Sequence, residues 1–150
     1  MNEKKFYPPL SEKVHVLENG QEPAPRKKIL LVDDDATLAD LTRMILEENG
    51  YDVDVASDGV HGIKKVLEND YSVILCDMVM PNVAGDMFYT AVERVKPHLC
   101  RRFLFMTGHH GDRKIDEFIR KVRGLILWKP FQPHVLMESI QAVLQKSGPD

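Results

Sequence analysis

The stretch ILLVDDDAT, residues 29–37, places four apolar residues directly before three consecutive aspartates. Its apolar run does not alternate with polar residues, which is typical of a parallel strand buried on both faces. Three further runs have the same length and character: VILC (73–76), FLFM (103–106) and LILW (125–128). The run DVDVA (52–56) alternates and suits an edge strand. The sequence therefore predicts five short strands.

Amphipathic helical patterns follow each of the five predicted strands. The first covers residues 36–49, and the second begins at a cap provided by Ser57 or Asp58. The third must end near Pro97, and Pro133 suits the first position of the fifth. The apolar faces of the five helices are formed by Leu38, Leu41, Ile45 and Leu46; by Ile63, Val66 and Leu67; by Phe88, Val92 and Val95; by Ile115, Phe118 and Val122; and by Leu136, Ile140, Val143 and Leu144. This alternation predicts an α/β fold, (βα)5, with a doubly wound parallel sheet and helices on both faces.

The composition suits one globular domain: 150 residues, 43% hydrophobic, with 20 basic and 23 acidic side chains and a net charge of −3. A mildly acidic chain has no general attraction to nucleic acid or to an anionic membrane. No apolar stretch approaches the ~18–20 residues that span a bilayer, and MNEKKFYPPL at the N-terminus lacks the apolar core of a signal peptide. Cys76 and Cys100 are expected to be reduced thiols. We expect a cytoplasmic protein without membrane insertion or nucleic-acid binding.

The first 27 residues differ from the rest of the chain. They contain four prolines and little periodicity, and the segment QEPAPRKK is typical of a linker. A short helix or strand around residues 12–17 is an alternative for part of this segment. We predict an N-terminal extension or linker over residues 1–27 and one domain over residues 28–147.

Polar residues follow four of the strands at one edge of the predicted sheet. Right-handed crossovers bring the C-terminal ends of parallel strands to the same edge, where such folds bind ligands. The residues that follow strands one, three, four and five are Asp33, Asp34 and Asp35, then Asp77, Thr107 and Lys129. Asp35 is expected to cap the following helix. The other side chains are expected to converge.

Clustered carboxylates require a counter-charge. Two carboxylates ~4 Å apart repel by about 4 kcal/mol at an effective dielectric constant near 20. A hard divalent cation removes this cost, and ligation by oxygen alone favours Mg²⁺. With Mg²⁺ and Lys129 present, three carboxylates are balanced until an anion arrives. A phosphoryl group that bridges the metal, Lys129 and Thr107 fits this site, with Asp77 as the nucleophile that forms an acyl phosphate.

The blocks VDDD, CDMVMPNVAG, FMTG and WKPF resemble the four signature blocks of the bacterial response-regulator receiver domain. The resemblance covers residues 28–146, and the blocks occur in the family's order. It implies a flavodoxin-like fold with strand order 2-1-3-4-5. It also implies a signalling switch rather than an enzyme, in which Asp77 accepts a phosphoryl group from a phosphohistidine of a sensor histidine kinase or a histidine phosphotransfer protein.

The resemblance also implies roles for individual residues. Asp33 and Asp34 match the acidic pair that binds Mg²⁺, which the family completes with the phosphoacceptor Asp77 and the backbone carbonyl of Val79. Such a set supplies oxygen ligands only, as Mg²⁺ prefers.

Thr107 and Lys129 match the two switch residues that contact the phosphoryl group. The bond between Lys129 and Pro130 is expected to be cis, as is usual in the family. Phosphorylation is implied to alter the face built from the fourth helix, the fifth strand and the fifth helix. A downstream protein partner would bind that face, and a homodimer is compatible with it.

Three features depart from the family pattern. Ile126 stands where the family often has an aromatic switch residue, so coupling to Thr107 is expected to be muted or replaced. In the family, the positions of His109 and Val79 tune the lifetime of the phosphoryl group. The family's lifetime therefore does not carry over to this chain. Ala84 replaces a frequent acidic residue.

Two other classes of function remain alternatives. Asp33 to Thr37 also satisfy DxDxT, the motif of haloacid dehalogenase-like phosphatases, with Asp33 as nucleophile and Asp35 as general acid. That family needs an acidic pair on a further strand, whereas only Glu138 and Asp150 follow Lys129. The other alternative is an unphosphorylated pseudo-receiver that only binds partners.

The output of the predicted switch is open at this level. The chain could be a stand-alone receiver, or the terminal receiver of a hybrid histidine kinase with residues 1–27 as the end of its linker.

Overall fold

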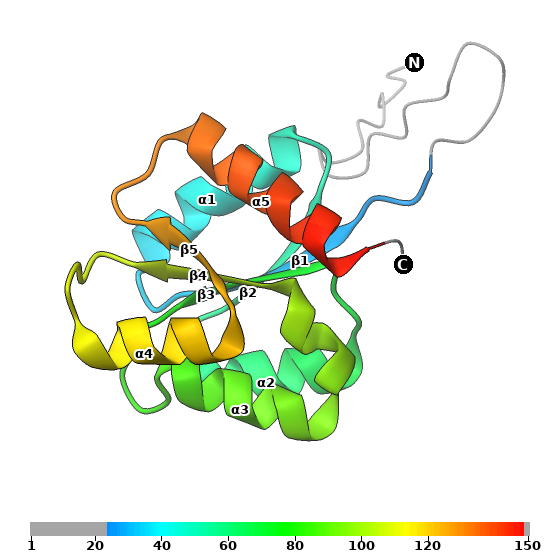
Figure 1. The fold of residues 1–150 in the computed structure, drawn as a ribbon. Coiled ribbons are helices and arrows are strands. Elements are labelled where there is room, and N and C mark those ends of the chain that lie inside the picture. Colours follow the sequence, from blue (N-terminus) through cyan, green and yellow to red (C-terminus); the bar gives the residue numbers. More distant parts are fainter. Residues whose placement is uncertain (1–23, 149–150) are drawn as a thin grey trace, which may run out of the picture.

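Five parallel strands form one sheet in this computed structural model, which describes residues 24–148 (Figure 1). The strands are β1 (Lys28–Val32), β2 (Asp52–Ala56), β3 (Val73–Asp77), β4 (Phe103–Thr107) and β5 (Leu125–Trp128). Their order is β2-β1-β3-β4-β5, which confirms the predicted doubly wound, flavodoxin-like sheet and the edge position of residues 52–56. The expected element around residues 12–17 lies outside the described residues.

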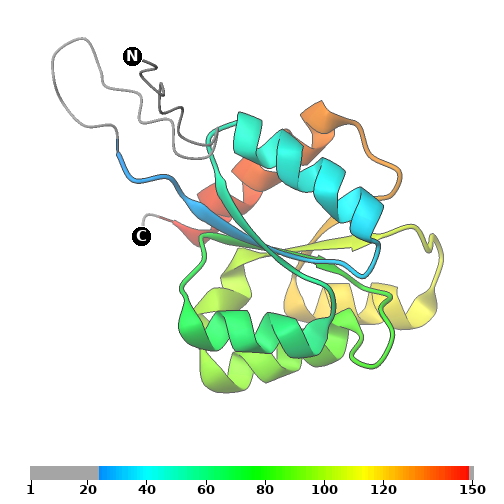
Figure 2. The same cartoon turned by 180° about the vertical axis from the view of Figure 1, so that it is seen from behind.

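Helices cover both faces of the sheet, as the unalternating apolar strands require. They are α1 (Ala36–Glu48), α2 (Gly59–Glu68), α3 (Gly85–Val95), α4 (Arg113–Val122) and α5 (Pro133–Ser147). Figures 1 and 2 show α1 and α5 on one face and α2, α3 and α4 on the other. No helix in the described part of the chain has the length and apolar character needed to cross a bilayer.

Among residues 24–148, one element was not predicted, a 3-10 helix labelled η2 (Pro97–Arg102). The predicted stop near Pro97 is correct, because α3 ends at Val95. Proline also suits the first turn of a helix, so the chain turns again before it enters β4. The apolar side chain of Leu99 is fully buried and anchors this turn.

Side chains cap the helices that the sequence marked. The Asp35 carboxylate accepts a hydrogen bond from the Leu38 amide at 3.0 Å, which confirms it as the cap of α1. The Asp58 carboxylate accepts one from the His61 amide at 2.8 Å, so Asp58 rather than Ser57 caps α2. These caps satisfy backbone donors that have no partner inside a helix.

The core is divided into two layers by the sheet. Along β1, Leu30 and Val32 face the layer under α2, α3 and α4, whereas Ile29 and Leu31 face the layer under α1 and α5. Because successive side chains of a strand point to opposite faces, an unbroken apolar run serves both layers. Cys76 and Cys100 are free thiols.

A glycine sets the distance between two helices on one face of the sheet. A Cβ added to Gly62 of α2 would lie 2.8 Å from Cε2 of Phe88, whose ring is fully buried on α3. We expect Gly62→Ala to lower the free energy of unfolding by about 1–2 kcal/mol, since overpacking outweighs the better helix propensity of alanine. Urea unfolding measures this. Lys64→Ala, at an exposed position of α2, is the control, and an equal loss in both variants would contradict the close-packing argument.

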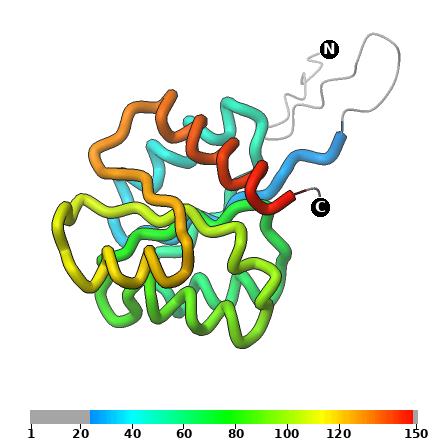
Figure 3. The backbone as a smooth tube through the Cα atoms, in the orientation of Figure 1, coloured from blue at the N-terminus to red at the C-terminus, as the bar shows by residue number. Residues whose placement is uncertain are grey.

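The fold separates the chain ends from the strand-end loops. Figure 3 shows the start of β1 and the end of α5 at one edge of the sheet, whereas the connections that leave the C-terminal ends of the strands lie at the opposite edge. The residues predicted to form the site belong to these strand ends and connections.

Candidate functional site

Three carboxylates meet at the C-terminal edge of the sheet. Asp33 and Asp34 follow β1, and Asp77 is the last residue of β3. Each offers an oxygen, and these three oxygens lie within 4.8 Å of one another. Asp33 and Asp77 are buried, with 2% and 6% of their surface exposed, whereas Asp34 is open to solvent. The predicted convergence of these acids is therefore correct.

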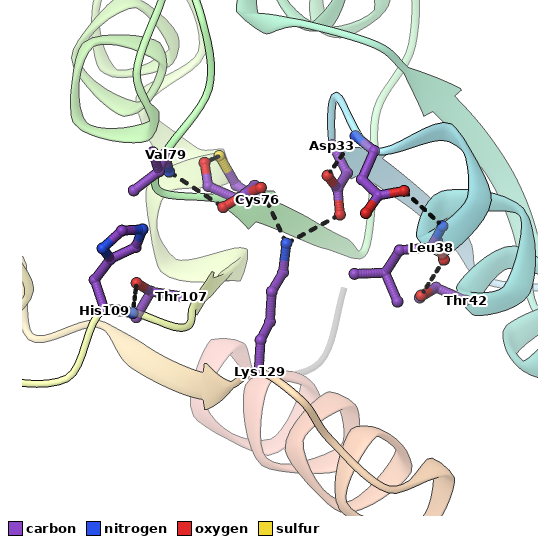
Figure 4. A network of polar contacts seen from close by, with 10 residues as sticks. Asp33, Leu38, Thr42, Cys76, Val79, Thr107, His109 and Lys129 are labelled. Carbon is purple, nitrogen blue, oxygen red and sulfur yellow. Dashed lines mark hydrogen bonds and ion pairs between the residues drawn. The ribbon is translucent and has the colours of Figure 1, made fainter.

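The Lys129 ammonium contacts both buried carboxylates, and Figure 4 shows its side chain reaching toward Asp33. Its Nζ donates to Oδ2 of Asp77 at 3.0 Å and to Oδ2 of Asp33 at 3.3 Å. The backbone places it there, because the Lys129 amide donates to the Thr107 carbonyl at 2.9 Å beyond the paired part of β4 and β5. The bond to Pro130 is cis, as expected.

Backbone amides hold the second oxygen of each buried carboxylate. The Asp35 amide donates to Oδ1 of Asp33 at 2.9 Å, and the Val79 amide donates to Oδ1 of Asp77 at 3.1 Å. Each carboxylate thus has one oxygen bonded to a neighbouring amide and the other bonded to Lys129. These hydrogen bonds fix the orientation of both carboxylates.

The charges at this edge do not balance. Burial raises the pKa of Asp33, and the negative charge of Asp77 adds to this effect, although the Asp35 amide and Lys129 act in the opposite direction. Burial lowers the pKa of Lys129, but its hydrogen bond to Asp77 and the charges of Asp77 and Asp33 outweigh burial and raise the pKa overall. The amine therefore stays protonated, and it supplies one positive charge beside three carboxyl groups.

These residues suit a hard divalent cation. All the available donors are oxygens, the Lys129 ammonium contacts only two of the three carboxylates, and the exposed Asp34 leaves the cluster accessible from solvent. Burial raises the pKa of Asp33, so a cation beside this carboxylate would offset the cost of burying its charge. Asp33, Asp34 and Asp77 are thus able to hold Mg²⁺, and no other comparable group of acids, histidines and cysteines occurs among residues 24–148.

Thr107 lies at the same edge, as the last residue of β4, and is buried. Its hydroxyl oxygen accepts a hydrogen bond from the His109 amide at 3.0 Å (Figure 4). In the described structure this hydroxyl is bonded to the connection that leads into α4, rather than to Asp77 or Lys129. Thr107 thus lies at the expected edge of the sheet, where its hydroxyl oxygen serves as an acceptor for this connection.

Sequence patterns missed the backbone contacts of the site. The amides of Asp35, Val79 and His109 each donate to a site side chain, yet every residue type except proline has such an amide. For Val79 the sequence singled out the carbonyl, and the structure adds the amide. Only the spacing gives a signal: each donor follows its acceptor by two residues, as in a turn closed by a polar side chain.

The buried thiol beside the site is inert. Cys76 precedes Asp77 in β3, and its thiol donates to the Asp77 carbonyl at 3.3 Å. Burial raises the pKa of this thiol well above its usual value, and the neighbouring charge of Asp77 acts in the same direction. Since the thiolate is the reactive form, this thiol is expected to serve as an apolar side chain of the core.

Several known proteins are similar to this chain in sequence. The sequence model of the response regulator receiver domain matches residues 29–141. The response regulator ArlR of Staphylococcus saprophyticus is 32% identical over 125 residues, which covers 79% of this chain and 53% of that protein. The alkaline phosphatase synthesis transcriptional regulatory protein PhoP of Bacillus subtilis is 33% identical over 127 residues, which covers 81% of this chain and 50% of that protein. The chain spans about half the length of these curated relatives.

Solved structures show the same fold. The chemotaxis protein CheY4 of Vibrio cholerae matches with a TM-score of 0.74 and 29% identity, covering 80% of this chain and 100% of that chain. A CheY-like receiver domain protein of Methanospirillum hungatei matches with a TM-score of 0.75 and 27% identity, covering 82% and 97%. The chain therefore belongs to the family of response regulator receiver domains of two-component systems, whose general function is that of a phosphorylation switch.

Proposed function

We propose that Asp77 accepts a phosphoryl group from a phosphohistidine of a sensor histidine kinase or a histidine phosphotransfer protein. The observation that carries this proposal is the position of Asp77 in the site. It is a buried carboxylate at a strand end, held by the Val79 amide and by Lys129, beside two further acids. Oxygen ligands for Mg²⁺ would come from Asp33, Asp34, Asp77 and the backbone carbonyl of Val79.

The residues have distinct tasks in this transfer. A carboxylate oxygen of Asp77 forms the new bond to phosphorus while the bond from phosphorus to the donor imidazole nitrogen breaks, and the electron pair of that bond leaves with the imidazole. The Lys129 ammonium, which lies 3.0 Å from Oδ2 of Asp77, then donates to the phosphoryl oxygens and offsets their charge. When bound, Mg²⁺ supplies additional neutralisation of negative charge. The chain thereby stores a phosphoryl group instead of turning over a substrate.

The switch would act through Thr107. A phosphoryl group on Asp77 presents strong acceptors, so the Thr107 hydroxyl gains by turning toward it and donating a hydrogen bond. The ends of β4 and β5 would then shift and alter the face formed by α4, β5 and α5. We propose that a downstream protein partner binds this face, and that a second copy of the chain is a candidate for the same surface.

The domain boundaries are part of the same proposal. Strand β1 begins at Lys28 and helix α5 ends at Ser147, which supports a receiver domain over residues 28–147 that follows an extension over residues 1–27. The free thiols of Cys76 and Cys100 favour a reducing compartment such as the cytoplasm.

Phosphorylation by a small donor tests the proposal directly. The chain is incubated with acetyl phosphate, with and without Mg²⁺, and its intact mass is measured. We expect the mass of one added phosphoryl group only when Mg²⁺ is present, located at Asp77 by peptide mapping after borohydride reduction of the acyl phosphate. An unchanged mass under both conditions would favour the pseudo-receiver alternative and overturn the proposal.

Magnesium is expected to stabilise the folded protein through the acidic cluster. A metal at about 100 times its Kd raises the free energy of unfolding by about 2.7 kcal/mol if it binds only the folded state. In Asp34→Asn we expect most of this gain to disappear, because a charged oxygen ligand is lost. Urea unfolding with and without Mg²⁺ measures the difference. Asp40→Asn is the control, since Asp40 is an exposed acid of α1 that lies outside the cluster, and it should keep the full gain.

A further inference from the structure

An aromatic pair joins the β4–α4 connection to the end of β5. The rings of His110 and Trp128 are stacked, with centroids 4.1 Å apart and planes inclined by 14°. His110 follows Thr107 by three residues, and Trp128 directly precedes Lys129. We propose that this stack couples Thr107 to the β5 surface, holding the connection in its present arrangement and separating when Asp77 is phosphorylated. This inference rests on the proposed function.

The stack is linked to Thr107 from both sides. The Thr107 hydroxyl accepts a hydrogen bond from the His109 amide, which sets the path of the chain into His110. On the other side, Thr107 and Trp128 are register partners in β4 and β5. The Thr107 carbonyl also accepts the amide of Lys129, the residue that binds the buried carboxylates. The position of the His110 ring on Trp128 therefore depends on the conformation of Thr107.

Turning the Thr107 hydroxyl toward Asp77 would disrupt this linkage. The hydroxyl oxygen accepts from the His109 amide, as Figure 4 shows, and rotation of the Thr107 side chain toward a phosphoryl group on Asp77 would carry this oxygen away from that amide. When the oxygen moves away, the His109 amide loses its partner and the connection is released at its first turn. His110 is the next residue along the chain and is exposed to solvent. Its ring then leaves the face of Trp128.

In this proposal the stack of His110 on Trp128, and not Ile126 inside β5, is the part of the structure that responds to Thr107. Ile126, two residues before Trp128, is aliphatic and packs against the core layer under α2, α3 and α4. It has no ring that could follow the movement of Thr107. Trp128 is 37% exposed, so its ring can change neighbours without opening a cavity in the core. The coupling therefore lies at the surface of this chain.

Removing the stack should make the switch easier to operate. Aromatic stacking stabilises only the state in which the rings touch, so its loss shifts the equilibrium toward the released connection. For His110→Ala we expect half-saturation at a roughly threefold to tenfold lower concentration of beryllofluoride, a phosphoryl mimic, with Mg²⁺ present. His110→Phe restores a ring and should return the value to that of the unmodified chain.

Tryptophan fluorescence reads the stack directly, because Trp128 is the only tryptophan in the chain. In the unmodified protein, emission should change as beryllofluoride and Mg²⁺ are added. In His110→Ala without beryllofluoride, Trp128 emission should already match that of the original sequence saturated with beryllofluoride. Adding beryllofluoride and Mg²⁺ to this variant should then change its emission little. His134→Ala removes another exposed imidazole, on α5, and should behave like the unmodified chain.

Two results would overturn the inference, and they can be told apart. If acetyl phosphate modifies Asp77, as shown by intact mass, but Trp128 emission and the half-saturation point are unaffected by His110→Ala, the stack plays no part in the switch and the proposed function stands. If Asp77 takes no phosphoryl group in the same samples, the proposed function fails and the coupling fails with it.

Discussion

Asp77→Asn is expected to abolish Mg²⁺-dependent incorporation of phosphate from acetyl phosphate. The amide has nearly the shape of the carboxylate, and its single oxygen can keep one of the two donors, the Val79 amide or Lys129, so the fold should be retained. It lacks the anionic oxygen that attacks phosphorus, so no acyl phosphate forms. The intact mass of Asp77→Asn should show no phosphorylated species after an incubation that fully phosphorylates the original sequence. Circular dichroism and urea unfolding should confirm that the variant is folded.

Two matched variants sharpen this result. Asp40→Asn makes the same chemical change on an exposed part of α1 and should leave phosphorylation intact. Asp33→Asn separates the receiver from the phosphatase alternative, because a haloacid dehalogenase-like enzyme would carry its covalent phosphate on Asp33. A phosphoryl group mapped to Asp33, and retained in Asp77→Asn, would refute the assignment. The structure already engages Asp35, the general acid of that alternative, as the cap of α1.

Lys129→Met is expected to cause the largest loss of stability among the site variants. The substitution keeps much of the apolar stem but removes the ammonium group that lies 3.0 Å from Asp77 and 3.3 Å from Asp33. Two buried carboxylates then lose their counter-charge. Breaking a buried ion pair typically costs 3–5 kcal/mol, and since 19% of the Lys129 side chain is exposed we expect about 2–4 kcal/mol. Urea unfolding without Mg²⁺ measures this loss.

A double-mutant cycle isolates the electrostatic origin of that loss. In Lys129→Met combined with Asp77→Asn, one of the two uncompensated charges is gone, so about 1–2 kcal/mol should be recovered relative to the sum of the single variants. Added Mg²⁺ should also restore part of the stability of Lys129→Met, because the cation supplies positive charge at the same carboxylates. Strictly additive losses, with no response to Mg²⁺, would show that Lys129 contributes packing instead of charge. Lys64→Met, at an exposed position on α2, is the control.

The sheet was predictable because its signals are local. The unalternating run at 29–32 indicated a strand buried on both faces, and the alternating run at 52–56 indicated an edge strand. Helix ends were equally clear where one residue decides them, as at the Asp35 cap and at Pro97. The 3-10 helix η2 escaped prediction because proline both ends one helix and suits the start of another.

The residues of the candidate site were predictable for a related reason. Parallel strands with right-handed connections bring their C-terminal ends to one edge, so the residues that follow each strand must meet there. Asp33 and Lys129 directly follow β1 and β5, whereas Asp77 and Thr107 are the last residues of β3 and β4, so all four lie at this edge. Their chemical types then indicate a cation and a phosphoryl group, before any distance is known.

The sequence by itself therefore determined the strands, the edge at which the polar residues gather, and the chemistry they favour. Only the tertiary structure decided which atoms meet. Lys129 and Asp33 are separated by 96 positions, and their contact depends on the way β5 and β1 are both held by the strands between them. The bond from the His109 amide to Thr107 and the stack of His110 on Trp128 depend on the path of one connection. Hydrophobic periodicity fixes where strands and helices lie, whereas the path of a connection and the rotamers of its side chains are fixed by packing between segments that are distant in the sequence.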